Sequence, residues 1–111
     1  MKLPNGNCAD LGDKVERYCL NSDHLKGKHK AKLFQKRLGI TLENKELLKD
    51  ALLEAAANKE TTFKRADRFG EYFNTRFYME TSTGSSWVLA CWIIRCKEDF
   101  PRLTNAYSVR Q

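Results

Sequence analysis

The 111-residue sequence lacks several features by which large classes of protein are recognised. It has no apolar run close to the roughly 20 residues that a membrane-spanning helix requires. The longest run, Trp87 to Ile94, has the length of a strand. The N-terminus has no apolar segment typical of an export signal, so we expect a cytoplasmic protein without membrane contact. The length excludes a TIM barrel or a two-domain Rossmann enzyme, and we expect one domain over 1–111.

Patterns for metals and disulfides are also missing. The four cysteines show no C-x-x-C spacing, and the string Cys8, Cys19, His24 and His29 is spaced unlike a zinc finger. Without an export signal, reduced thiols are the default. The sequence has no D-x-D, H-E-x-x-H or phosphate-binding glycine loop, and its carboxylates are scattered, which disfavours two-metal nuclease chemistry. We therefore expect no metal and no other cofactor.

Positive charge is what the sequence has in excess, with 20 Lys and Arg against 14 Asp and Glu and a net charge of +6. Residues 1–40 hold nine cations and four acids, a net +5, and no acid occurs between His24 and Leu42. A solvated helix face is one interpretation of this basic segment. The absence of glutamates that would form i,i+4 pairs favours an anionic partner, either RNA or DNA phosphates or an acidic protein. The six cations of the segment are Lys26, Lys28, Lys30, Lys32, Lys36 and Arg37.

Residue spacing predicts an α+β fold, mainly helical over 1–58 and antiparallel sheet over 59–111. Apolar stripes indicate three N-terminal helices, at 13–20, from 27 or 28 to 38, and from 41 or 44 to 58. Alternation and β-branched or aromatic residues indicate a sheet of three or four strands, at 61–65, 72–81, 87–96 and 102–109. The third strand is nearly all apolar, which predicts that it is covered on both faces. Helices followed by strands are typical of helices packed on one face of a sheet.

Two histidines and one arginine are candidates for chemistry. His29 lies among lysines at the start of the second helix, where neighbouring cations disfavour the imidazolium and suit a general base. The alternative is that His29 caps or packs at the helix start, while His24 lies in the preceding loop. Arg95 sits in an otherwise apolar strand, and because unpaired burial of charge is costly, it must reach a strand end or a functional concavity.

The last strand and the aromatic residues offer further candidates. In a regular strand Thr104 shares a face with Arg102, and Tyr107 points to the other side. The aromatic side chains could stack on bases, although packing in the core is the alternative for each of them. They are Tyr72, Tyr78, Trp87 and Trp92.

Two motifs resemble a known family. Residues 20–41 follow the pattern L-N-x-x-H-x-x-G-x-H-K-A-x-x-F-x-x-x-L-G-I-T, and 101–107 read P-R-L-x-x-A-Y after the aromatic W-I pair at 92–93. They resemble a bacterial toxin-like domain family found beside a small partner gene or at the C-terminus of polymorphic toxins. Its order of elements is similar to the barnase–EndoU–colicin E5–RelE ribonuclease superfamily, which cleaves RNA without a metal. The resemblance implies a site of His29, with Lys28 or Lys30, Arg95, Thr104 and Tyr107, and of the two lysines we take Lys30 as the catalytic one.

The leading hypothesis is a metal-independent endoribonuclease toxin of a toxin–antitoxin or toxin–immunity pair, which leaves 2′,3′-cyclic phosphate ends. His29 would deprotonate the ribose 2′-OH, and Lys30 and Arg95 would stabilise the transition state. Tyr107 or His24 would protonate the leaving oxygen, and Thr104 with Tyr107 would position the phosphate. The expected partners are RNA and a small acidic antitoxin or immunity protein. The expected substrate-binding residues are His24, Lys26, Lys28, Lys32 and Arg102.

Two alternatives use the same basic segment. A non-catalytic nucleic-acid-binding module would bind with strong salt dependence and would not cleave. A basic adaptor would dock an acidic partner protein instead.

Overall fold

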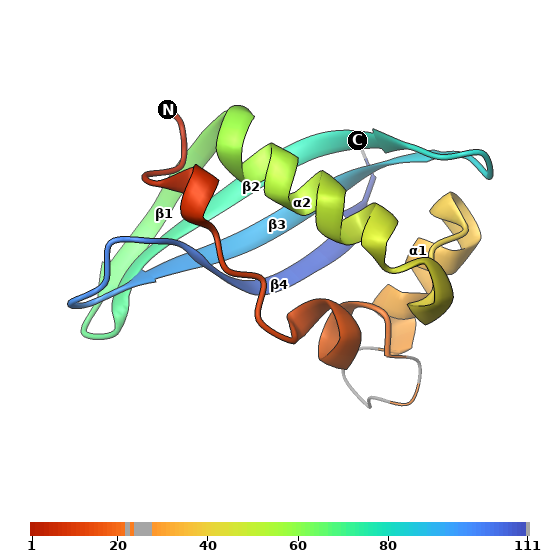
Figure 1. The fold of residues 1–111 in the computed structure, drawn as a ribbon, viewed down its shortest axis with the longest axis horizontal. Helices are drawn as coiled ribbons and strands as arrows, with labels where there is room; N and C mark the ends of the chain where they lie inside the picture. Colours follow the sequence, from red (N-terminus) through yellow and green to blue (C-terminus); the bar gives the residue numbers. More distant parts are fainter. Residues whose placement is uncertain (22, 24–27, 111) are drawn as a thin grey trace.

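The computed structural model describes residues 1–21, 23 and 28–110 and has an α+β fold (Figure 1). Its helical segments come first: η1 (Gly6–Cys8), η2 (Val15–Cys19), α1 (Lys28–Leu38), η3 (Leu42–Asn44) and α2 (Glu46–Asn58). Its four strands follow: β1 (Thr61–Asp67), β2 (Gly70–Glu80), β3 (Ser85–Arg95) and β4 (Arg102–Val109).

The first expected helix is the one that differs most from the prediction. Instead of a helix over 13–20, the chain forms a five-residue π-helical turn, η2, in which Leu20 N donates to Val15 O at 3.0 Å. So short a segment cannot offset the cost of helix nucleation by itself. The α2 helix was predicted well to its end at Asn58, but neither suggested cap is its N-cap. It begins at Glu46 after Lys45, which makes no side-chain cap bond, and Thr41 and Asn44 cap the short η3 instead. Thr41 Oγ1 accepts from Glu43 N at 3.3 Å, and Asn44 Oδ1 accepts from Thr41 N at 2.7 Å.

The four strands form an antiparallel sheet in the order β1-β2-β3-β4. We call the face against the helices the inner face and the opposite one the outer face. The α2 helix crosses the inner face (Figure 1), with Leu48 and Leu52 fully buried. The prediction that β3 is covered on both faces was wrong for most of its length. Its even positions from Ser86 to Ile94 are buried, whereas the odd positions from Trp87 to Cys91 are half-buried.

A chain of hydrogen bonds crosses the buried side of the sheet. Trp92 Nε1 donates to Thr75 Oγ1 at 3.1 Å, and Thr75 Oγ1 lies 2.9 Å from Thr61 Oγ1. The Thr61 hydroxyl in turn donates to the Asn74 carbonyl at 2.9 Å. Because every polar group in this chain has a partner, the indole of Trp92 is buried without an unsatisfied N–H. This fixes Trp92 in the core and excludes it as a base-stacking surface.

In the part of the chain that the structure describes, no helix is long and apolar enough to cross a membrane.

We predict that Thr75→Val lowers the free energy of unfolding by about 1–3 kcal/mol, because the substitution keeps the shape of the side chain but leaves Trp92 Nε1 without an acceptor. Urea denaturation measures the change. Thr62→Val, at an exposed position of β1, is the control and should change the free energy by less than about 0.5 kcal/mol. Equal stability of the two variants would contradict this role of Thr75.

Candidate nucleic-acid interface

The outer face of the sheet carries the side chains that alternate with the core positions. Along β1 and β2 this face is open, with Arg65, Arg76 and Tyr78 exposed. Tyr78 keeps 49% of its surface accessible, and its hydroxyl donates to Ser85 Oγ at 2.6 Å. By strand pairing and alternation, the outer face carries Thr62, Arg65, Asp67, Tyr72, Asn74, Arg76, Tyr78, Glu80, Ser85, Trp87, Leu89, Cys91, Ile93, Arg95, Arg102, Thr104, Asn105, Tyr107 and Val109.

Cations stand over aromatic rings at three places on this face. A cation within about 6 Å of a ring centroid is attracted by the ring's negative face. The pairs are Arg65 over Tyr72 at 3.9 Å, Arg76 over Trp87 at 5.0 Å, and Lys30 over Tyr107 at 4.9 Å. Sequence analysis had named the rings but not Arg65 or Arg76. The alternation of residues 72–78 predicts that Arg76 lies on the same face as Tyr72 and Tyr78, and Arg76 could have been identified from it.

A bulge in β4 brings Thr104 and Tyr107 to the same face. Cys91 pairs with Asn105 and Trp92 with Leu103, so Thr104 is the extra residue of the bulge. The prediction that Tyr107 points away from Thr104 was made for a regular strand, and the bulge means that this condition is not met. The Thr104 hydroxyl donates to the Cys91 carbonyl at 3.1 Å and is exposed on the outer face.

The cations of α1 divide between two flanks of the helix. At about 100° per residue, Lys30, Leu33 and Arg37 form one stripe, and it faces the sheet. Arg37 Nη1 donates to Ser108 Oγ of β4 at 2.9 Å. Lys28 and Lys32 lie on the opposite flank, where Lys32 borders a separate hollow with Gln35 and Glu43.

His29 and Lys36 occupy the solvent side next to the stripe that faces the sheet, and both are exposed. His29 is therefore exposed next to Lys30 in the sequence and does not pack in the core. Two expected substrate-binding residues, His24 and Lys26, lie outside the described residues.

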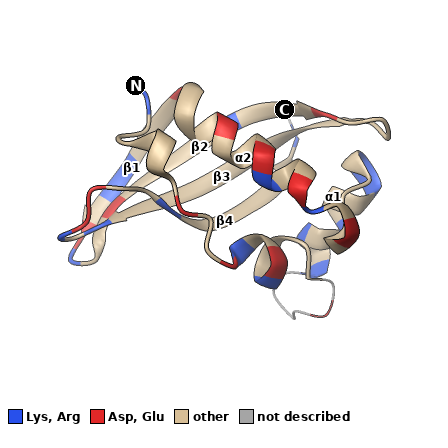
Figure 2. Cartoon of the chain, viewed as in Figure 1, with Lys and Arg blue, Asp and Glu red and all other residues tan. Residues whose placement is uncertain are grey.

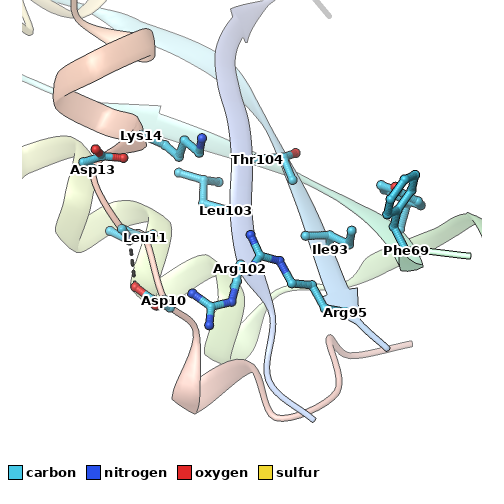
Figure 3. Close-up of a pocket in the computed structure, with 12 residues that line it drawn as sticks. Asp10, Leu11, Asp13, Lys14, Phe69, Ile93, Arg95, Arg102, Leu103 and Thr104 are labelled. Atoms are coloured by element: carbon cyan, nitrogen blue, oxygen red, sulfur yellow. Dashed lines mark hydrogen bonds and ion pairs between the residues drawn. The ribbon is translucent and has the colours of Figure 1, made fainter. Parts of the chain in front are cut away.

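Two pockets lie at opposite ends of the outer face. One, of about 510 Å³, has α1 on one side and the strands on the other, and the charged side chains of its described lining are all basic. Its lining includes Leu33, Lys36, Arg37, Tyr78, Trp87 and Arg110. The other, of about 660 Å³, is the pocket of Figure 3 and contains Arg95, Arg102 and Thr104.

The two arginines of the larger pocket differ in their partners. Arg102 is held by Glu98, with bonds of 2.9 Å to both carboxylate oxygens, and by Asp10 at 3.2 Å. The bonds from Arg102 lower the pKa of Glu98. Arg95 forms no hydrogen bond or ion pair with any residue that the structure describes. The free positive charge at this end of the sheet therefore belongs to Arg95 rather than to Arg102.

The expected catalytic residues do not form one cluster. Tyr107 pairs with Leu89, six positions before Arg95 on β3. At 3.3 Å per residue, Arg95 and Leu89 lie about 20 Å apart along the strand. Lys30 and Tyr107 are in contact and His29 precedes Lys30 in α1, whereas Arg95 and Thr104 belong to the larger pocket. Lys30 and Arg95 are thus too far apart to contact one and the same anionic group.

Acidic residues gather along α2, although the outer face is not free of acids, since Arg65 is ion-paired with Asp67 at 2.7 Å. Figure 2 shows acidic residues along α2, where Glu46, Asp50 and Glu54 recur every fourth residue and are exposed. The cation–aromatic pairs lie on the other side of the sheet from α2. An anionic ligand therefore meets attraction on the outer face and repulsion at α2.

Burial also changes the chemistry of side chains on and near the outer face. It raises the pKa of Tyr107, with a smaller contribution from Cys91. Burial also raises the pKa of the Cys91 thiol, while the positive charge of Lys30 lowers it by a smaller amount. Burial raises the pKa of Cys19 to about 11. Tyr107 therefore stays protonated at neutral pH and can donate a hydrogen bond or a proton.

The fold and this face define a basic α+β domain that carries cation–aromatic pairs on an open sheet face. The sequence matches the family described as Domain of unknown function (DUF6883) over residues 2–110, and the chain belongs to that family. No curated protein matches the sequence.

We predict that a thiol reagent at pH 8 modifies the exposed Cys8 and Cys96 first, Cys91 more slowly and Cys19 only on unfolding. A pKa of about 11 in place of 9.0 lowers the thiolate fraction of Cys19 about a hundredfold. Mass spectrometry of alkylated peptides over time gives the order, and urea is the control that should make all four equivalent. Modification of Cys91 no faster than Cys19 would show that the outer face is closed.

Proposed function

We propose that the protein binds single-stranded RNA across the outer face and cleaves it there without a metal ion. The observation that carries this proposal is the set of three cation–aromatic pairs on one open face. Proteins that bind single strands combine rings, on which bases stack, with cations that neutralise the backbone. Arg76 with Trp87 and Arg65 with Tyr72 supply both groups at two points of the sheet. These points are about 20 Å apart along β3, because Tyr72 pairs with Ile93, six positions after Trp87.

Cleavage is assigned to the Lys30–Tyr107 pair and the neighbouring His29. His29 takes the proton of a ribose 2′-OH, and the 2′ oxygen forms a bond to the adjacent phosphorus. The bond from phosphorus to the 5′ oxygen breaks, and the 5′ oxygen takes a proton from Tyr107. Lys30 stabilises the negative charge that develops on the phosphate. The products are a 2′,3′-cyclic phosphate and a 5′-hydroxyl end.

Tyr107 is protonated at neutral pH and so has a proton to donate, while burial raises its pKa and makes it a weaker acid than a free tyrosine. Lys30 also supports the assignment, since its ammonium group lies 4.9 Å from the Tyr107 ring and so carries positive charge to this point. The need for a 2′-OH makes RNA, rather than DNA, the substrate of the reaction.

A cleaving enzyme of this kind needs restraint in the cell that makes it. We assign that role to a small acidic antitoxin or immunity protein, since the exposed cations of α1 and of the outer face attract such a partner. The protein would then be the toxin of the pair.

Binding without cleavage is the second candidate function. The pairs Arg76–Trp87 and Arg65–Tyr72 account for binding without any reaction. The two candidates differ in one measurement, the appearance of new RNA ends.

We predict that the purified protein cleaves total RNA in the presence of EDTA and that His29→Ala lowers the rate about 10²–10⁴-fold, the usual contribution of a positioned base. Mapping of 3′ ends should detect 2′,3′-cyclic phosphates. A substrate with a 2′-deoxyribose at the cleaved position should bind and stay intact. Gln35→Ala, an exposed change on the far flank of α1, is the control. Full activity of the His29→Ala variant would contradict the role of His29 as the general base. If the wild-type protein leaves the RNA intact, only the binding function remains.

We also predict that Trp87→Ala weakens binding of a single-stranded RNA about ten- to a hundredfold, because loss of one stacked base costs about 1–3 kcal/mol. Arg76→Gln should weaken binding and reduce the dependence of affinity on salt. Fluorescence anisotropy over a series of salt concentrations measures both effects. Lys59→Gln removes one exposed charge beyond α2 and should have little effect. An equal effect of Lys59→Gln would indicate attraction by net charge rather than by the outer face.

A further inference from the structure

We infer that the pocket beside Arg95 binds one nucleotide of the RNA chain, with the phosphate on Arg95 and the base among the apolar side chains. The assignment to an RNA chain rests on the proposed function, whereas the nucleotide chemistry of the pocket rests on the pocket itself. Four segments surround it: the loop over 10–14, the β1–β2 turn, the end of β3 and the start of β4. Its volume of about 660 Å³ falls in the range of small-molecule sites.

Arg95 is the anion-binding group of this pocket. Figure 3 shows its side chain extending from the end of β3 toward β4, where Arg102 and Leu103 lie. No described residue pairs with Arg95, although its charge contributes to the lowered pKa of Glu98. An unpaired guanidinium can form a bidentate contact with a phosphate.

The carboxylates of the pocket already have partners. Asp10 Oδ1 accepts from Gly12 N at 2.8 Å, and its other oxygen accepts from Arg102 at 3.2 Å. Asp13 pairs with Arg17 at 3.2 Å. The pocket also contains Lys14. With both acids neutralised, the charges that remain for a ligand are positive.

The rest of the lining suits a flat apolar ring. Phe69 and Tyr72 supply aromatic surface, and Ile93 and Leu103 supply aliphatic surface. Phe69 is unusual because 58% of its surface is exposed although it is a large apolar residue. An exposed phenylalanine at a pocket rim offers a surface on which a base can stack.

The turn that presents Phe69 is held rigidly. Asp67 Oδ1 accepts from Phe69 N at 2.8 Å, and Cys96 N donates to Phe69 O at 3.0 Å. Gly70, with a φ of 153°, completes the turn, and a Cβ there would lie 2.2 Å from Ile94 O. Because both backbone groups of Phe69 are fixed, little conformational entropy is lost when a ring stacks on it.

The two parts of a nucleotide match the two parts of this pocket. The phosphate matches the unpaired guanidinium of Arg95, and the base matches the apolar wall, by which we mean Phe69, Tyr72, Ile93 and Leu103. Inorganic phosphate would use only Arg95, and a nucleoside would use only the wall. The chemistry of the pocket therefore predicts that the joined molecule binds more tightly than either part.

Isothermal titration calorimetry with adenosine 5′-monophosphate tests the inference, with adenosine and inorganic phosphate as partial ligands. We expect the monophosphate to bind at least about tenfold more tightly than either part. Arg95→Gln should weaken its binding about ten- to a hundredfold, as expected for the loss of hydrogen bonds between charged groups. Lys97→Gln removes one positive charge two residues away, outside the pocket, and should leave binding unchanged.

A second pair of variants tests the apolar wall. Phe69→Ala should weaken binding about tenfold or more, whereas Phe63→Ala, at another exposed phenylalanine that packs on Phe73, should not. Thermal unfolding of each variant shows whether it is folded. No binding of the monophosphate to the folded wild type, or equal binding by the Arg95 variant, would overturn the inference.

Competition identifies the source of the nucleotide. A single-stranded RNA made uncleavable by 2′-O-methylation should displace the monophosphate if the pocket holds part of the chain. Simultaneous binding of both would overturn the assignment to the chain and indicate a free nucleotide. His29→Ala should bind the monophosphate as the wild type does. The two hypotheses can therefore fail separately. If the cleavage mechanism is wrong, the monophosphate still binds, and if the pocket is wrong, the monophosphate does not bind.

Discussion

The bulge at Thr104 decides which side chains of β4 share a surface with the rest of the sheet. Side chains alternate strictly between the two faces of a strand, so one extra residue moves every later side chain to the other face. Without the bulge, Tyr107 or Thr104 would be directed into the core, on the side of β4 where α1 and η2 pack. With it, Thr104 and Tyr107 both lie on the outer face, and Ala106 remains buried beneath them. The Lys30–Tyr107 contact, and with it the connection between α1 and the outer face, depends on this shift.

The polar outer face stays open at low cost because its cations and rings satisfy each other. An exposed sheet face of rings alone would attract other chains, and one of cations alone would repel itself. Arg76 covers the face of Trp87 while its guanidinium donates to the Arg110 carbonyl at 2.9 Å. A nucleic-acid strand offers the same two kinds of contact, since a base can stack on the ring and a phosphate can take the cation. Under our proposal, RNA therefore exchanges contacts with these pairs and requires no new cavity.

Sequence patterns predicted the elements of this fold better than they predicted its site. The stripe of Leu48, Leu52 and Ala55 and the alternation of Phe73, Thr75 and Phe77 were sufficient for α2 and β2, because local burial repeats with the period of the element. The bulge at Thr104 has no such signal, because only the pairing of β4 with β3 produces it.

The sequence also does not show that the lysines of α1 lie on two different flanks of the helix. The order of charges along the chain does not tell which flank packs on the sheet. Lys30 faces Tyr107, whereas Lys32 faces away. The separation of Arg95 from Lys30 follows in the same way from strand register, which no spacing in the sequence reports. A strand of RNA that contacted both cations would extend about 20 Å along β3. Arg95 would then hold one nucleotide while Lys30 and His29 act on a bond several nucleotides away. In that arrangement the pocket selects and positions the strand, and the chemical step depends on α1. Substitutions at Arg95 should therefore act mainly on KM, and substitutions at His29 on kcat.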